Sequence, residues 1–293
     1  MSRDKQRVAV ISGASSGIGK EAAKALAAQG WKVIGIGRNA ERSAAALEEI
    51  RAAAANGGEA EMLVADLAIM AEVVAVADRI GALTDRVDAL LNNAGGIPSE
   101  KVVTAEGLEE NFAGNHLGPF LLTSRLLPLL RNAAAAAPAG RVRIVNTSSD
   151  ASEMIPDMPW DDLQLLNRFN EGAAYCRSKL ANVMFARGLA KRLAADGIVA
   201  HAVHPGVVAS NFSSHASAET RSRISQLQAL TPAEGADTVI WLTTAAEPGL
   251  NGGYYFERRE KAPNPLVNDE AAVDRLWAAS EALIAGTGVQ VSW

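Results

Sequence analysis

The segment Val8-Ala9-Val10-Ile11-Ser12-Gly13-Ala14-Ser15-Ser16-Gly17-Ile18-Gly19 decides the fold of this chain. Its leading apolar run predicts a short buried strand, and the alanine-rich stretch from Lys20 to Gln29 predicts a helix that ends at Gly30. The glycines therefore stand in a turn between a strand and a helix. Such a turn lets backbone N–H groups approach an anion at the helix N-terminus. The segment predicts a binding turn for the pyrophosphate of a dinucleotide rather than an empty glycine-rich turn.

Strand-like and helix-like segments then alternate from Arg7 to about Ala245, with no linker rich in proline or serine between them. This alternation is typical of an α/β fold with a doubly wound parallel (Rossmann) sheet that has helices on both faces. We expect about seven strands in a single dinucleotide-binding catalytic domain over residues 1–293. Two segments, near 150–172 and 210–230, are expected to be insertions that shape a substrate pocket.

Tyr175 and Lys179 stand four residues apart in the segment Tyr175-Cys176-Arg177-Ser178-Lys179. A helix brings residues i and i+4 onto one face, so we expect the Lys179 ammonium beside the Tyr175 phenol. A free phenol has a pKa of about 10, and a neighbouring cation stabilises the phenolate and lowers that pKa. The pair predicts acid/base chemistry, although this spacing alone also occurs on solvated helix faces.

The spacing Gly13-x-x-x-Gly17-x-Gly19 resembles the T-G-x-x-x-G-x-G turn of the short-chain dehydrogenase/reductase family, with Ser12 in the place of threonine. The resemblance spans Arg7 to about Phe256 and is nearest to the retinol dehydrogenase-like members, whose relatives include WW-domain oxidoreductases and protochlorophyllide reductases. Four further motifs follow in the family's order: Asn92-Asn93-Ala94-Gly95, Asn115, Ser148-Ser149 and Pro205-Gly206.

The resemblance implies four catalytic residues, Asn115, Ser149, Tyr175 and Lys179. Tyr175 would exchange the proton, Ser149 would hold the substrate oxygen, and Asn115 would hold a water that links Lys179 to solvent. Strand alternation places Ser148 and Ser149 on opposite faces, so only one of them can serve. Asparagine is also a poor residue for a helix interior, and a local helix irregularity is the alternative explanation for Asn115.

The cofactor expected from the resemblance is NADP. An NAD-selecting enzyme places Asp or Glu at the end of the second strand, whereas this chain has Gly37 there, followed by Arg38, which can bind a 2′-phosphate. A solvated surface arginine is the alternative. The predicted cofactor-binding residues are Gly13, Ser15, Ser16, Gly17, Ile18, Gly19, Arg38, Asn39, Asp66, Leu67, Asn93, Ala94, Gly95, Tyr175, Lys179, Pro205, Gly206 and Val208.

Composition excludes several other classes of protein. The net charge of −5 gives no general attraction to nucleic acid or to an anionic membrane. The single cysteine, Cys176, excludes an internal disulfide and is read as a packing residue, and the four histidines lack the spacing of metal ligands. The chain enters its first strand directly after Met1 to Arg7, without a signal peptide or a membrane span, so we expect a cytoplasmic protein.

These observations predict an NADP-dependent carbonyl reductase or alcohol dehydrogenase for a small hydrophobic substrate, because the insertion near 150–172 is rich in apolar residues. A double-bond reductase of the enone or protochlorophyllide kind and a non-catalytic dinucleotide-binding sensor are the alternatives. Relatives often form dimers or tetramers, so we also consider a homodimer or homotetramer. The leucines that would face a partner, unless they only cover the sheet, are Leu121, Leu122, Leu126 and Leu129.

Overall fold

The centre of the protein is one sheet of eight strands in the order β3-β2-β1-β4-β5-β6-β7-β8. The computed structural model describes residues 6–97, 99–247 and 249–293. The expectation that the chain starts without a signal peptide concerns the first five residues, which lie outside the described part. All neighbouring strands up to β7 pair in parallel. The strands are β1 (Val8–Ser12), β2 (Lys32–Gly37), β3 (Glu59–Val64), β4 (Ala89–Asn92), β5 (Val142–Thr147), β6 (Ile198–Val203), β7 (Tyr254–Phe256) and β8 (Arg259–Glu260).

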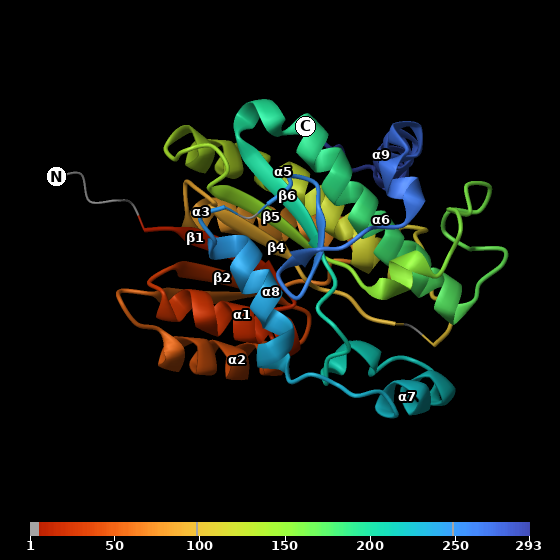
Figure 1. The fold of residues 1–293 in the computed structure, drawn as a ribbon, viewed down its shortest axis with the longest axis horizontal. Helices are drawn as coiled ribbons and strands as arrows, with labels where there is room; N and C mark the ends of the chain where they lie inside the picture. Colours follow the sequence, from red (N-terminus) through yellow and green to blue (C-terminus); the bar gives the residue numbers. More distant parts are fainter. Residues whose placement is uncertain (1–5, 98, 248) are drawn as a thin grey trace.

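Helices cover both faces of the sheet (Figure 1). The core cluster on one face includes residues of α3, α5, α6 and α9, and the cluster on the other face includes residues of α1, α2 and α8. The helices are α1 (Gly17–Ala28), α2 (Ala40–Ala53), α3 (Met70–Leu83), α4 (Glu110–Phe112), α5 (Gly118–Ala135), α6 (Glu171–Arg192), α7 (Ala218–Ser225), α8 (Pro232–Thr244) and α9 (Glu270–Ala285).

The central strand β1 shows why the sequence gives this architecture. Val8 and Val10 pack into the cluster on one face of the sheet, and Ala9 and Ile11 pack into the cluster on the other. A strand that is buried on both faces needs apolar residues at every position, which explains its continuous apolar run. The doubly wound parallel sheet predicted from the sequence is confirmed.

The sheet has one strand more than the seven expected. β8 pairs antiparallel with β7 at the sheet edge, after a turn in which Glu257 and Arg258 both have positive φ, 49° and 60°. Both residues of β8, Arg259 and Glu260, are exposed and charged. A strand of two charged residues carries no hydrophobic alternation, so it cannot be predicted from periodicity.

The parallel arrangement places the candidate site at one edge of the sheet. The carboxyl ends of β1, β2, β4, β5 and β6 all lie at this edge, since these strands run in one direction. The chain leaves β1 toward α1 on one face and leaves β4 toward α5 on the other, so the sheet has its topological switch point between β1 and β4. Ligands of doubly wound sheets bind outside such a point.

The leucines considered for a subunit interface lie inside the single chain. Leu121, Leu122 and Leu126 of α5 are at most 1% exposed and belong to the main core, and Leu129 is half-buried against it. The C-terminal segment covers α5 as well, because Ser292 exchanges two hydrogen bonds with Ser124. The interpretation that these leucines cover the sheet is therefore correct, and the partner-facing interpretation is wrong for the three buried ones.

This burial makes Leu121, Leu122 and Leu126 unavailable to a partner subunit. We expect light scattering at micromolar concentration to give a mass near the 30.6 kDa of one chain. A mass of twice that value would contradict this expectation and would require an interface on other elements.

Candidate active site

Ser12 at the end of β1 joins the glycine turn to the loop after β4. Its hydroxyl accepts hydrogen bonds from the backbone N–H groups of Asn93, at 2.9 Å, and Ala94, at 3.0 Å. A Cβ on Gly13, whose φ is +71°, would lie 3.0 Å from the Cα of Ala94. The turn is therefore compact because Gly13 lacks a side chain, and serine performs the linking role at the position where the family pattern has threonine.

The N-terminus of α1 fits an anion. Ser16 stands at its N-cap, and in the described structure its side chain makes no capping hydrogen bond and the first turn contains no acidic residue. Gly17 has a φ of +56°, a left-handed conformation that favours glycine. The unpaired N–H groups and the helix dipole at this end are suited to a phosphate group.

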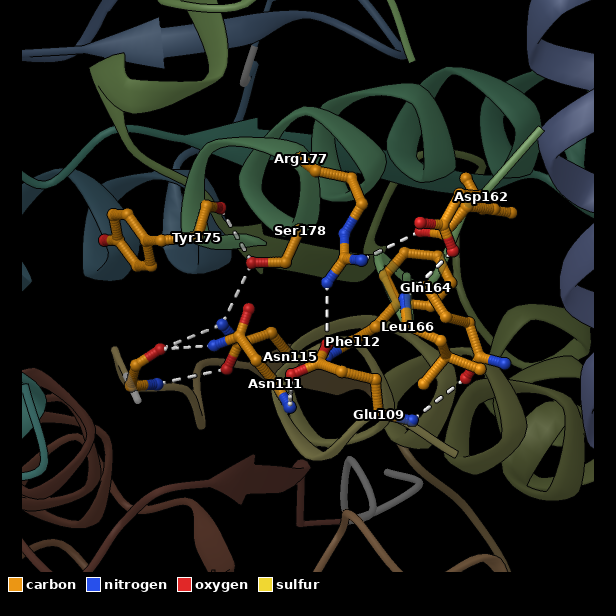
Figure 2. Close-up of polar contacts among 12 residues, drawn as sticks. Glu109, Asn111, Phe112, Asn115, Asp162, Gln164, Leu166, Tyr175, Arg177 and Ser178 are labelled. Atoms are coloured by element: carbon orange, nitrogen blue, oxygen red, sulfur yellow. Dashed lines mark hydrogen bonds and ion pairs between the residues drawn. The ribbon is translucent and has the colours of Figure 1, made fainter. Parts of the chain in front are cut away.

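Asn115 lies in a π-helical turn, Ala113–Leu117, between α4 and α5. Its side chain exchanges two hydrogen bonds with the backbone of Gly96, each 3.0 Å long, and donates a third to the Ser178 hydroxyl, also at 3.0 Å. Figure 2 shows Ser178 between Asn115 and Tyr175, since Ser178 donates in turn to the Tyr175 carbonyl at 2.8 Å. The helix irregularity considered from the sequence is present, and it points Asn115 toward the tyrosine helix.

Tyr175 and Lys179 share one face of α6, as predicted. The Lys179 Nζ lies 5.6 Å from the centre of the Tyr175 ring and donates to the Thr147 carbonyl at 3.2 Å. The backbone of Gly95 passes close to Lys179 and Asn115, because a Cβ at Gly95 would lie 3.2 Å from Lys179 Nζ and 3.0 Å from Asn115 Oδ1. Asn115, Lys179 and Tyr175 thus form one cluster.

The expectation that Lys179 lowers the pKa of Tyr175 is wrong for the protein alone. Burial raises the pKa of the Tyr175 phenol, and the negative charge of Asp150 raises it further, although the Ser149 hydroxyl acts in the opposite direction. Burial also lowers the pKa of Lys179 to about 8. Both groups lose solvation in their charged forms, and this loss is the largest cause of each shift.

The two serines after β5 diverge, as strand alternation predicts. Ser148 is buried and its hydroxyl donates to the Lys179 carbonyl at 2.7 Å. Ser149 faces the site, where its hydroxyl interacts with Tyr175 and donates to Asp150 Oδ1 at 3.0 Å. Ser149 is therefore the serine beside the phenol, and Ser148 fixes the helix that carries Lys179.

The end of β2 excludes a side chain at Gly37. A Cβ at this position would lie 2.4 Å from the Ser43 hydroxyl and 2.9 Å from the Cβ of Ser15. Arg38 follows with a half-exposed side chain, whose guanidinium lies 3.8 Å from Asp66 and 3.6 Å from Glu110. The site thus lacks room for a carboxylate at position 37 and offers a cation next to it.

Other predicted cofactor residues have additional structural roles. Asn39 caps α2 by accepting from the Arg42 N–H at 2.9 Å, and Asp66 accepts from the Ala68 N–H at 2.9 Å. Leu67 is buried in the main core, so contact with a cofactor would be limited to its backbone. The structure places the remaining predicted residues along the same edge of the sheet: Ile18 and Gly19 in the first turn of α1, and Pro205, Gly206 and Val208 after β6.

The segment 210–230 crosses this edge as a lid that contains α7. At the base of this lid the Ala209 N–H donates to the Leu230 carbonyl at 2.9 Å. The Phe212 carbonyl accepts from the Ile97 N–H at 3.1 Å, and the centre of the Phe212 ring lies 6.5 Å from the centre of the Tyr175 ring. His215 Nε2 is 3.1 Å from an Arg38 nitrogen. The lid thus reaches from Arg38, the predicted 2′-phosphate ligand, to Tyr175.

The lid is also tied to the start of the tyrosine helix. Glu171, the first residue of α6, accepts hydrogen bonds from the backbone and the hydroxyl of Ser217 and from the Thr220 hydroxyl, each at 2.8 Å. Its carboxylate thereby connects α7 to α6 one turn before Tyr175.

The segment 150–172 is anchored rather than free. The buried Arg177 of α6 donates to the Leu163 carbonyl and pairs with Glu109 at 2.7 Å, and both charged side chains are at most 1% exposed. Gln164 accepts from the Glu109 N–H, so the same carboxylate residue joins the insertion to α4 (Figure 2). Within the insertion Met158 belongs to the main core, whereas Met154 is 75% exposed.

Sequence reasoning missed several polar residues of the site. Asp150 directly follows Ser149, and neither Glu109 nor His215 belongs to a recognisable motif. Arg177 lies inside the Tyr175-to-Lys179 segment, where its place on a buried helix would have signalled a charge that needs a partner. Cys176 is buried, as expected for a packing residue.

Two classes of site do not occur in the described part of the chain. Residues 6–97, 99–247 and 249–293 contain no group of three or more His, Cys, Asp or Glu side chains that could hold a metal ion. None of the helices in these ranges combines the length and apolar character needed to cross a membrane.

Comparison with known proteins identifies the family. The family model for short chain dehydrogenases matches residues 7–221, so the chain belongs to this family and is an oxidoreductase. Human retinol dehydrogenase 12 is 39% identical over 279 residues, which cover 94% of this chain and 85% of that protein. The match to the retinol dehydrogenases confirms the resemblance inferred from the motifs.

Solved structures agree with the fold. The crystal structure of an uncharacterised protein from Mycobacterium paratuberculosis superposes with a TM-score of 0.75 at 29% identity, covering 98% of this chain and 96% of that one. The RhlG/NADP active-site complex of Pseudomonas aeruginosa gives a TM-score of 0.67 at 26% identity, covering 85% and 93%.

The burial of Lys179 has a consequence for stability. Because its folded-state pKa of about 8 lies below the ordinary 10.5, the unfolded chain binds more protons between these values, and the free energy of unfolding rises with pH across this window. Below about pH 8 the buried charge therefore destabilises the fold. We expect Lys179→Met to raise the free energy of unfolding at pH 7 by about 2–3 kcal/mol, and this gain should fall by more than half at pH 9.5.

Denaturant unfolding at both pH values checks this. Thr147 O keeps a donor in the variant, since Asn182 also donates to it at 3.2 Å. Lys24→Met on α1, which removes a partly exposed lysine, is the control and should change stability by less than about 0.5 kcal/mol at either pH. A Lys179→Met protein that is less stable than wild type at pH 7 would refute the assignment.

Proposed function

We propose that the protein transfers hydride between NADP(H) and a hydrophobic alcohol or carbonyl compound, with Tyr175 as acid and base. The observation that carries this proposal is the meeting of Ser149, Tyr175 and Lys179 with the glycine turn at one edge of the sheet. The retinol dehydrogenases among its relatives and the NADP complex among the similar structures support the substrate class and the cofactor.

The residues present fit NADP(H). The N–H groups in the first turn of α1 have no partner within the helix and suit its pyrophosphate. The missing side chain at Gly37 leaves no carboxylate to repel a 2′-phosphate, and Arg38 offers charge-assisted hydrogen bonds. Lys179 would hold the nicotinamide ribose, and Asn93, Ala94 and Gly95 would border the ring. When bound, NADP(H) supplies the hydride donor or acceptor.

The protein's own residues would supply the proton and the orientation. Ser149, beside the phenol, would hold the substrate oxygen, and Tyr175 would give its proton to that oxygen during reduction and take it back during oxidation. Lys179, with a pKa of about 8, can carry a proton near neutral pH and pass it toward Tyr175. Asn115 would fix the helix turn around the tyrosine, since its side chain bonds to Gly96 and Ser178.

The alternatives make different demands on these residues. A double-bond reductase would use Tyr175 to protonate carbon, and a non-catalytic sensor would need the glycine turn without the cluster of Asn115, Ser149, Tyr175 and Lys179. The intact cluster argues against a sensor, which has no need of all four residues. A cytoplasmic location stays a prediction of the sequence.

Oxidation of NADPH against a panel of aldehydes, ketones and enones tests the proposal. We expect turnover of hydrophobic aldehydes or ketones. Turnover of enones alone, with reduction at carbon, would favour the double-bond reductase, and binding of NADPH without any turnover would favour the sensor.

Tyr175→Phe should abolish turnover, because phenylalanine keeps the ring but has no proton to transfer. NADPH affinity, measured by fluorescence titration, should stay near the wild-type value. Turnover above a few per cent of wild type would remove Tyr175 from the mechanism.

Arg38→Ala should weaken NADPH binding by about 1.5–3 kcal/mol, the contribution of hydrogen bonds to a charged group, and should change NADH binding little. Calorimetric titration with both cofactors measures the difference. Arg42→Ala, in the exposed first turn of α2, is a matched control that should leave both affinities unchanged. Equal losses for both cofactors after Arg38→Ala, or no loss, would contradict a role in binding the 2′-phosphate and point to a surface role.

A further inference from the structure

Asp150 is the charged residue nearest to the substrate-orienting serine. Its Oδ1 accepts the hydrogen bond of the Ser149 hydroxyl at 3.0 Å, and its side chain is 59% exposed. The substrate oxygen is proposed to bind at this same hydroxyl. The Ser149 hydroxyl has one proton, so it must turn from Asp150 to donate to a substrate carbonyl, and the Asp150 carboxylate then stands close to the reacting group.

The other charged groups around Asp150 do not neutralise it. His204 Nδ1 accepts from the Asp150 N–H at 3.2 Å, and its Nε2 lies 3.9 Å from Oδ2, but burial lowers the pKa of His204 and favours the neutral ring. Lys261 is paired with Glu153. Lys179 is buried beside Gly95 and donates to the Thr147 carbonyl.

A second observation agrees that this charge acts inside the site. The negative charge of Asp150 contributes to the raised pKa of Tyr175, after the larger effect of burial. A charge that acts on the phenol also acts on a substrate bound beside the phenol, because the two oxygens are hydrogen-bonding partners in the proposed reaction.

We propose that Asp150 is a specificity-determining residue that disfavours substrates with a negative charge next to the reacting carbonyl. The natural substrate is then a neutral or cationic aldehyde, ketone or alcohol, and α-keto acids are excluded. This inference rests on the proposed function. It adds that the hydrophobic substrate carries no negative charge beside its carbonyl group.

The test compares two ketones that differ in one charge, phenylglyoxylate and its methyl ester. Wild-type protein should show a higher kcat/KM for the ester, and Asp150→Asn should reduce the ester-to-acid ratio on the order of five- to tenfold, mostly by improving the acid. Asp150→Glu should keep the preference. Asp78→Asn on α3 removes the same charge outside the site and is the matched control.

Salt provides a readout that a purely structural role would not change. Added salt should lower the ester-to-acid ratio of kcat/KM in wild type, because salt screens the repulsion between the Asp150 carboxylate and the carboxylate of the acid. The ratio of Asp150→Asn, which lacks this repulsion, should stay nearly constant. A ratio that is equal in wild type and Asp150→Asn would overturn the inference while leaving the proposed function intact.

Binding of the corresponding alcohols separates this inference from the proposed function. Calorimetric titration of NADP⁺-saturated protein with mandelate and methyl mandelate requires no turnover. If neither ketone is reduced, the proposed function is contradicted for this substrate class, and the ratio of the two dissociation constants in wild type and Asp150→Asn still decides whether Asp150 selects against the charge.

Discussion

The buried ion pair between Glu109 and Arg177 is the interaction on which the site depends (Figure 2). Glu109 caps α4 through the N–H groups of Asn111 and Phe112, immediately before the π-helical turn of Asn115. Arg177 holds the insertion through the Leu163 carbonyl and lies two residues after Tyr175. Removal of one partner from such a pair leaves an uncompensated buried charge, which costs about 3–5 kcal/mol. A single pair therefore fixes α4, the insertion and the tyrosine helix to one another.

Burial also sets the chemistry of the site. It raises the pKa of Tyr175 and lowers the pKa of Lys179 to about 8, so the protein keeps few charges near the place of reaction. Hydride transfer to a carbonyl needs a proton at oxygen but no fixed charge on the substrate. Low solvation of this kind suits apolar carbonyl compounds, whereas the Asp150 carboxylate beside Ser149 is 59% exposed and acts as a charge that solvent and salt screen.

Those parts of the structure that follow from local rules were predictable from the sequence. The glycine turn, the doubly buried strand β1, the divergence of Ser148 and Ser149, and the shared face of Tyr175 and Lys179 all follow from strand and helix periodicity. The remainder depends on contacts between distant residues. Glu109 and Arg177 are 68 positions apart, β8 has no apolar pattern, and the leucines of α5 look equally suited to a partner or to a core. The mutual influence of Tyr175 and Lys179 was misjudged because sequence spacing carries no information about solvation.

The π-helical turn at Ala113–Leu117 changes the phase of a continuous helix that runs from α4 into α5. One additional residue in a turn advances every later side chain by about 100° around the axis. Phe112 lies before this turn and Leu121 after it, and both point into the core. The 3.6-residue spacing of buried positions that includes Phe112 therefore does not continue to Leu121. Deletion of a single residue between 113 and 117 would restore a regular helix, and the same rotation would carry Leu121 and Leu122 away from the sheet. The π-helical turn and the packing of α5 thus depend on each other, because a change of one residue in the length of this helix would disturb both.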